Sequence, residues 1–84
     1  MTFEQVVRDS GCPVSSVARL FKVTRQTLYY WMQGHEPTSE INIAFKNKIY
    51  EALKKGFTNG DMPIRPDVQD KYKALAAVVR KNVG

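Results

Sequence analysis

The sequence predicts an all-α protein, a compact bundle of four to five short helices. Three observations support this prediction. Apolar residues recur at the helical period of about 3.6 residues in five segments of the chain. Glycine, proline and helix-capping residues separate these segments. Alternation of apolar and polar residues, which is typical of a strand, is confined to short pieces that could pair only at the edge of a sheet.

Two short helices are expected near the N-terminus. Thr2 and Gln5 fit a capping box, in which a hydroxyl and an amide satisfy free backbone N–H groups at a helix start. The first helix is therefore placed at about residues 3–10, and Gly11 can end it in a left-handed conformation. A second helix is expected at about residues 14–21. Its predicted buried face holds Val14, Val17, Ala18 and Phe21.

Two further helices are expected in the middle of the chain. Thr24 is a favourable N-cap for a third helix at about residues 25–32. Thr38 or Ser39 can cap a fourth helix, whose apolar residues repeat with a clear helical period. Gly56 is expected to end this fourth helix, because glycine is common at helix C-termini.

The rest of the chain is predicted to form a loop or tether at residues 57–66 and a fifth helix at about residues 66–81. Apolar side chains of the fifth helix recur at i, i+4, i+7 and i+11, so they share one face. This stripe has few places to pack once four helices have closed a core, and we expect it to mediate oligomerisation. The stripe consists of Val68, Tyr72, Leu75 and Val79.

The charge of the 84-residue chain favours an anionic partner. Lys and Arg exceed Asp and Glu by 13 to 8, which gives a formal net charge of +5 and a pI of about 9.6. No Asp or Glu occurs from Ser10 to His35, so this third of the chain is purely cationic. Its basic residues are Arg19, Lys22 and Arg25. Charge alone leaves the kind of anionic partner open.

Several classes of protein are excluded by what the sequence lacks. No apolar run approaches the roughly 20 residues of a membrane-spanning helix, and the first residues lack the basic and apolar regions of a signal peptide. We therefore expect a cytoplasmic protein. One histidine and one cysteine provide neither a catalytic triad nor a zinc site, so no enzyme, metal or cofactor is expected. Cys12 is expected to be a small buried residue at a helix junction.

Two short helices joined by a three-residue break form a helix-turn-helix pattern. The segment SSVARLFKVTRQTLYYWMQGHEP, within about residues 13–37, resembles the helix-turn-helix of Cro and phage-repressor (XRE-like) proteins. Ala18 stands at the small-residue position where the two helices cross, and Val23 at the apolar position of the turn. Leu28 and Trp31 stand at the apolar positions of the recognition helix.

Gly34 stands where the terminal glycine of this family closes the recognition helix. The family usually has glycine where this chain has Lys22, so Lys22 is expected to take an uncommon backbone conformation. The piece TRQTLYYW is also similar to the start of regulators in the MerR group, although the winged segment of that group does not follow it.

The resemblance implies a sequence-specific regulator of transcription that binds double-stranded DNA. It favours a phage or prophage Cro-like repressor, which binds a palindromic operator as a homodimer through a recognition helix at residues 25–32. No small-molecule effector is expected, and the expected location is the cytoplasm of a bacterial cell or phage-infected host. Residues 1–56 would form the DNA-binding domain and residues 57–84 the oligomerisation element.

The resemblance also assigns roles to individual residues. Base reading falls to Arg25, Gln26 and Tyr30, since arginine can grip guanine through O6 and N7 and glutamine can pair with adenine through N6 and N7. Trp31 is expected to point inward. The expected contacts to phosphate or the groove wall are Ser15, Ser16, Arg19, Lys22, Thr24, Thr27, Tyr29 and His35.

Alternatives remain open for these residues and for the function. Each polar residue could be an ordinary solvated position, and Tyr29 and Tyr30 could instead pack on the first or fourth helix. Lys46 and Lys48 could extend the phosphate footprint or only solubilise the fourth helix. The alternative functions are a small subunit for phage DNA packaging, which would form a ring, and a protein-binding module of the antitoxin or inhibitor type.

Overall fold

The computed structural model describes residues 2–61 and 69–83. This part of the chain is all-helical and contains no strand, as the sequence predicts. None of its helices is long and apolar enough to cross a bilayer. In chain order its helices are α1 (Phe3–Asp9), α2 (Val14–Leu20), α3 (Arg25–Met32), α4 (Glu40–Asn59) and α5 (Lys71–Asn82).

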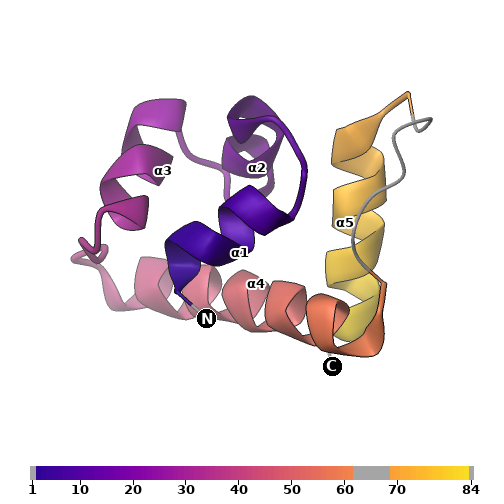
Figure 1. The fold of residues 1–84 in the computed structure, drawn as a ribbon. Helices are drawn as coiled ribbons and strands as arrows, with labels where there is room; N and C mark the ends of the chain where they lie inside the picture. Colours follow the sequence, from indigo (N-terminus) through magenta and orange to yellow (C-terminus); the bar gives the residue numbers. More distant parts are fainter. Residues whose placement is uncertain (1, 62–68, 84) are drawn as a thin grey trace.

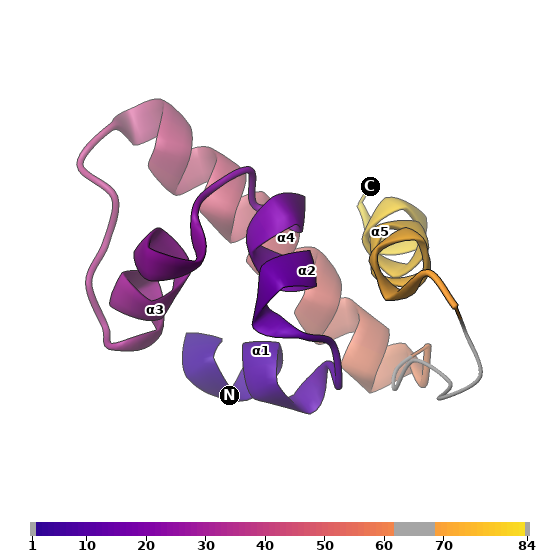
Figure 2. The same cartoon turned by 90° about the horizontal axis from the view of Figure 1, so that it is seen from above.

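The long helix α4 packs against α5 and α1. The short helices α1, α2 and α3 lie over α4, and α5 packs across its C-terminal half (Figure 1). Seen from above, α5 lies beside both α4 and α2 (Figure 2). All five helices contribute to one hydrophobic core. Fully buried side chains in this core are Val6, Val17, Phe21, Leu28, Leu53 and Leu75.

The predicted caps of the first and third helices are confirmed. The backbone N–H of Gln5 donates to Oγ1 of Thr2 over 3.2 Å, and the N–H of Thr2 donates to Oε1 of Gln5 over 3.1 Å, which completes the capping box. At the start of α3, the N–H of Thr27 donates to Oγ1 of Thr24 over 3.2 Å. These local hydrogen bonds fix where α1 and α3 begin.

The predicted end of the fourth helix at Gly56 is wrong. Helix α4 continues to Asn59 and ends at Gly60, which takes the left-handed conformation with φ of 79°. A glycine inside a helix costs only about 1 kcal/mol relative to alanine, and the next residue, Phe57, packs against the core. Burial therefore outweighs the weak helix propensity, and residues 57–59 of the predicted loop are helical.

The fifth helix is predicted to begin at about residue 66, but residues 69 and 70 are not helical, so this prediction is also wrong. Helix α5 begins at Lys71. Asp70 is instead the N-cap of α5, because its Oδ1 accepts a 3.0 Å hydrogen bond from the N–H of Lys73. Residues 62–66 of the predicted loop and residues 66–68 of the predicted helix lie outside the described residues.

The apolar stripe of α5 packs inside its own chain. Leu75 is 0% exposed and Val79 is 8% exposed, both within the core shared with α2 and α4. Tyr72 is half-buried, and the guanidinium of Arg19 lies 4.3 Å from the centroid of its ring. The expectation that this stripe lacks places to pack within the chain is wrong, because α2 and α4 leave a surface that α5 fills. Val68 lies outside the described residues.

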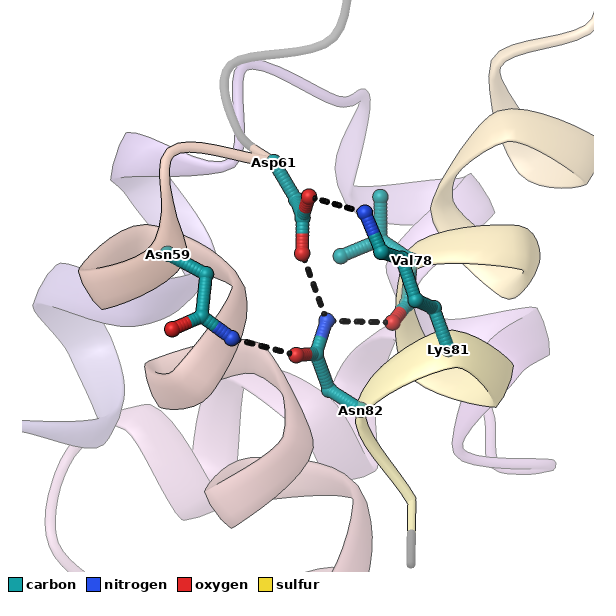
Figure 3. A network of polar contacts seen from close by, with 5 residues as sticks. All are labelled: Asn59, Asp61, Val78, Lys81 and Asn82. Atoms are coloured by element: carbon teal, nitrogen blue, oxygen red, sulfur yellow. Dashed lines mark hydrogen bonds and ion pairs between the residues drawn. The ribbon is translucent and has the colours of Figure 1, made fainter.

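Polar side chains join the C-terminal ends of α4 and α5 (Figure 3). The side-chain amide of Asn82 donates to Oδ2 of Asp61 over 3.0 Å and to the carbonyl of Val78 over 2.9 Å. Its oxygen accepts a 2.9 Å hydrogen bond from the amide of Asn59. Lys81 donates to Oδ1 of Asp61 over 2.8 Å. The hydrogen bonds from Lys81 and Asn82 lower the pKa of the Asp61 carboxyl below its ordinary value.

Candidate nucleic-acid interface

Helix α3 has one buried face and one exposed face. Leu28 is 0% exposed and Trp31 is 6% exposed, so the prediction that Trp31 points inward is confirmed. The two tyrosines lie on the other face, where Tyr29 is 48% and Tyr30 is 53% exposed. Both tyrosines therefore lie outside the core, with about half of each side chain exposed. The helical period separates the three adjacent aromatic residues in this way.

Trp31 is held by rings from α1 and from the end of α2. Its ring centroid lies 6.3 Å from that of Phe3 and 5.9 Å from that of Phe21, with interplanar angles of 75° and 83°. Such edge-to-face pairs are favourable beyond the area they bury. They fix the rotation of α3 about its own axis, and this rotation determines which side chains the helix exposes.

Lys46 lies beneath the loop that follows α3, although the sequence suggests a surface position. It is 4% exposed, and its Nζ donates to Oε1 of Glu36 over 2.8 Å. The same ammonium lies 4.9 Å from the centroid of the Phe3 ring. Both interpretations of Lys46, as a phosphate contact and as a solubilising residue, are wrong. Its ion pair instead anchors the loop after α3 to α4.

The turn between α2 and α3 has the conformation that the helix-turn-helix resemblance implies. Lys22 has φ of 57°, so the expected uncommon backbone conformation is confirmed. The N–H of Val23 donates to the carbonyl of Ala18 over 3.0 Å, which closes the turn. Ala18 is 3% exposed, as expected for a small residue where two helices meet. This tight turn brings the N-terminus of α3 to the surface.

The exposed face of α3 borders an open hollow of about 860 Å³, here called the α3 surface. It combines the three predicted base-reading residues with three of the predicted phosphate or groove contacts. One further member, Gln33, is not among the predicted contacts, although its position four residues after Tyr29 places it on the same helix face. The α3 surface is lined by Thr24, Arg25, Gln26, Thr27, Tyr29, Tyr30 and Gln33.

The α3 surface is chemically suited to hydrogen bonding with an anionic partner. Its side chains offer a guanidinium, two amides and four hydroxyl groups, and none of them is a carboxylate. Arg25 and Gln26, in the first turn of α3, are both exposed. Amides and guanidinium groups are the side chains that pair with base edges in the DNA major groove.

The remaining predicted phosphate contacts do not line the α3 surface. Ser16 and Arg19 border a separate hollow of about 380 Å³ between α2 and the start of α5, and Arg19 is stacked there over Tyr72. Ser15 is exposed on α2. Lys22 lies in the turn, with its Nζ 5.8 Å from the centroid of the Phe45 ring.

His35 is exposed and stacks on Tyr30. The two ring centroids are 3.8 Å apart and the interplanar angle is 11°. The N–H of His35 also donates to the carbonyl of Tyr30 over 3.4 Å. The stack extends the aromatic part of the α3 surface into the loop. A spacing of five residues across a helix end gives no sequence signal for such a contact.

Cys12 lies at a helix junction, where α1, α2 and α5 meet, as expected, but it is only half-buried. Its Sγ lies 3.9 Å from the carbonyl oxygen of Lys71. Burial raises the pKa of the thiol, so the group stays protonated at neutral pH and is a poor nucleophile. Among the described residues, no three His, Cys, Asp or Glu side chains gather where they could hold a metal ion.

No family model, curated protein or solved structure matches this chain.

Proposed function

We propose that this protein is a sequence-specific regulator of transcription that binds double-stranded DNA and places α3 in the major groove. The α3 surface carries the proposal, because it gathers Arg25, Gln26 and Tyr30 on one exposed helix face without a carboxylate. The major groove, about 12 Å wide, admits an α-helix. In helix-turn-helix proteins the first turns of the recognition helix contact the bases.

Electrostatics supports the same proposal. The chain carries a net charge of +5, and Lys22 and Arg25 are exposed at the turn and at the start of α3. Neither of them forms an ion pair with any described carboxylate. Both cations are therefore available to DNA phosphates or bases, and the affinity for DNA should fall as salt rises.

Repression by occupying a palindromic operator as a homodimer is the form of regulation that we propose. It follows from the resemblance to Cro and phage-repressor proteins, whose paired half-sites match a two-fold protein dimer. The buried residues of α5 do not form the interface of this dimer, since Leu75 and Val79 fill the core of their own chain. The dimer would use another surface.

A protein-binding module is the second candidate function. It is favoured by the two neighbouring tyrosines on α3, which are 48% and 53% exposed. Tyrosine is enriched in protein–protein interfaces. In that case the α3 surface would bind a protein, and the binding of duplex DNA would be weak and insensitive to sequence.

The test is selection of binding sites from a random duplex pool at about 50 mM and about 200 mM salt. Three proteins are compared: wild type, the double variant Arg25→Ala/Gln26→Ala, and the control Gln69→Ala/Lys73→Ala. The control removes one cation and one amide from exposed positions at and near the start of α5. Wild type and control are expected to enrich the same palindrome. The Arg25→Ala/Gln26→Ala variant should keep only weak, salt-sensitive binding.

Either of two results would refute the proposal. If wild type enriches no sequence at either salt concentration, α3 does not read bases. If the Arg25→Ala/Gln26→Ala variant enriches the same palindrome as wild type, base reading lies elsewhere. In the first case, capture of a protein partner through Tyr29 and Tyr30 becomes the function to test.

A further inference from the structure

An apolar strip on α4 leads from the solvent into the core. Ile41 is 81% exposed, Phe45 is half-buried and Ile49 is 5% exposed. Their spacing of four residues places them in one row along the helix, over about 12 Å. A single exposed isoleucine would need no explanation. Ile41, however, is the outer end of a continuous apolar row.

Two hollows border this strip, and together they form what is here called the α4 groove. The first, of about 510 Å³, lies between the turn before α3 and the first half of α4. The second, also about 510 Å³, lies between α4, α5 and the end of α2. Lys22 and Phe45 line both hollows, so the hollows adjoin. The floor of the second hollow includes Leu20, Ile49, Val79 and Val83.

The charged residues described around the α4 groove all have the same sign. Lys22, Lys48 and Arg80 line it and are exposed, and no residue within 2–61 and 69–83 that lines either hollow is acidic. Within residues 2–61 and 69–83, the ion pairs involve other cations, namely Arg8, Lys46, Lys54 and Lys81. The groove therefore combines an apolar floor with three cations that lack a described carboxylate partner.

We propose that the α4 groove binds an acidic amphipathic helix of a partner protein. The apolar side of that helix would lie on the Ile41–Phe45–Ile49 strip, and its carboxylates would pair with Lys22, Lys48 and Arg80. Helices commonly bind to grooves in this way, through apolar anchors at i, i+3, i+4 and i+7. Charge complementarity selects the acidic sequence and suppresses other partners. The α4 groove is distinct from most of the α3 surface, sharing only Thr27 with it.

Other occupants fit the α4 groove less well. A second copy packed groove against groove would place cation against cation, which is repulsive. DNA would match the cations, but protein–DNA interfaces are polar and the apolar strip would gain no partner. The proposal does not depend on DNA binding, so either of the two proposals can fail alone.

The test uses a synthetic, fluorescein-labelled helix of about 16 residues, long enough to form helix in isolation. It carries leucine at the anchor positions and glutamate on the other face. One control peptide has the same composition in scrambled order, and another has lysine in place of glutamate. Binding is measured by fluorescence anisotropy and mapped by amide chemical shifts in NMR spectra of the ¹⁵N-labelled full chain.

Two kinds of protein variant accompany the peptides. Lys48→Glu/Arg80→Glu reverses two cations of the α4 groove, and its control Lys55→Glu/Lys73→Glu makes the same charge change at exposed positions outside it. Ile41→Ser removes the exposed end of the apolar strip, and its 81% exposure keeps the fold intact. Each variant is also assayed for binding to a fixed duplex DNA.

We expect the acidic peptide to shift the amide signals of the α4 groove and the two control peptides to leave them in place. Lys48→Glu/Arg80→Glu should weaken binding about 10-fold, because two attractive pairs become repulsive. Ile41→Ser should also weaken it, and Lys55→Glu/Lys73→Glu should bind like wild type.

Four results would overturn the proposal. Saturating peptide could leave the groove signals unchanged. The Lys48→Glu/Arg80→Glu variant could bind the peptide as wild type does but lose duplex DNA binding beyond its control, which would make the groove a phosphate footprint. Groove signals could move with protein concentration alone, which would make it a self-interface. The α4 groove could bind anionic lipid vesicles and not the peptide, which would make the groove a membrane contact.

Discussion

Lys46 donates a 2.8 Å hydrogen bond to Glu36 from a side chain that is 5% exposed. Because its stem is buried, Lys46→Ala should lower the free energy of unfolding by about 2–4 kcal/mol. Lys46→Met keeps the stem without the charge and should cost about 1 kcal/mol or less. Urea denaturation measures the free energy of unfolding of both variants. Exposed Lys55→Ala is the control, and an equal effect at both lysines would contradict the buried role of Lys46.

Replacement of Lys22 by glycine should stabilise the protein. Lys22 has φ of 57°, where an ordinary side chain costs about 1 kcal/mol more than glycine. Lys22→Gly should therefore raise the free energy of unfolding by up to about 1 kcal/mol, as measured by urea denaturation. Lys22→Ala removes the same charge but keeps the strained backbone, so it should give no such gain. If Lys22→Gly and Lys22→Ala are equally stable, the left-handed backbone at Lys22 does not cost stability.

Leu75 should be essential for the stability of the monomer. Its side chain is 0% exposed, and Leu75→Ala should cost about 2–5 kcal/mol through lost burial and the cavity left behind. The exposed Ala77→Ser should change stability by no more than about 0.5 kcal/mol. Thermal unfolding measures the stability of wild type and both variants, and sedimentation measures their oligomeric state. Unchanged stability with a changed oligomeric state would instead assign Leu75 to an interface between chains.

The network around Asp61 should make stability sensitive to acid. Because hydrogen bonds from Lys81 and Asn82 lower the pKa of Asp61 in the folded state, the carboxylate stabilises the fold above its ordinary pKa near 3.8. This contribution is lost as the pH falls through the lowered folded-state value. Asp61→Asn should therefore lower the melting temperature at pH 6 to 7, and the difference from wild type should fade in acid.

The variant Lys81→Gln provides the matched comparison for this network. Lys81 makes the largest contribution to lowering the pKa of Asp61, so the pH dependence should shrink in this variant without disappearing, because Asn82 remains. The same dependence on pH in wild type and Asp61→Asn would show that the network does not hold a charged Asp61.

The stack of Tyr30 and His35 should be visible in solution. At a centroid distance of 3.8 Å, the ring current of Tyr30 should move the carbon-bound ring protons of His35 upfield in NMR spectra. Tyr30→Leu should return them to ordinary positions. His35→Ala should cost only about 0.5 kcal/mol of stability, at the low end for an aromatic pair because both rings are exposed. Unshifted His35 signals in wild type would refute the stack.

The sequence predicts the first three helices well because their signals are local. Thr2 and Thr24 each form the expected cap, and a capping residue acts within one helical turn. The junction of α4 and α5 is predicted poorly because tertiary contacts decide it. Burial around Gly56 carries α4 past the expected stop, and Asp70 supplies a cap later than the predicted start.

Part of the candidate interface can likewise be predicted from the sequence, and part cannot. The faces of α3 follow from the helical period, which places Trp31 inside and Tyr30 outside. Lys46 could not be placed from sequence, because lysine is almost always exposed unless it is paired. Its partner Glu36 is ten positions away, in a loop whose path only the folded chain defines.

The packing of α5 on α2 has a consequence for synthesis on the ribosome. Cys12 and Lys71, which lie 59 positions apart in sequence, come together where these helices meet. Part of the core side of α2 is covered by α5, and chains are made at about 5–20 residues per second. For several seconds of synthesis α2 therefore lacks this cover, and part of its hydrophobic face stays open until α5 has left the exit tunnel.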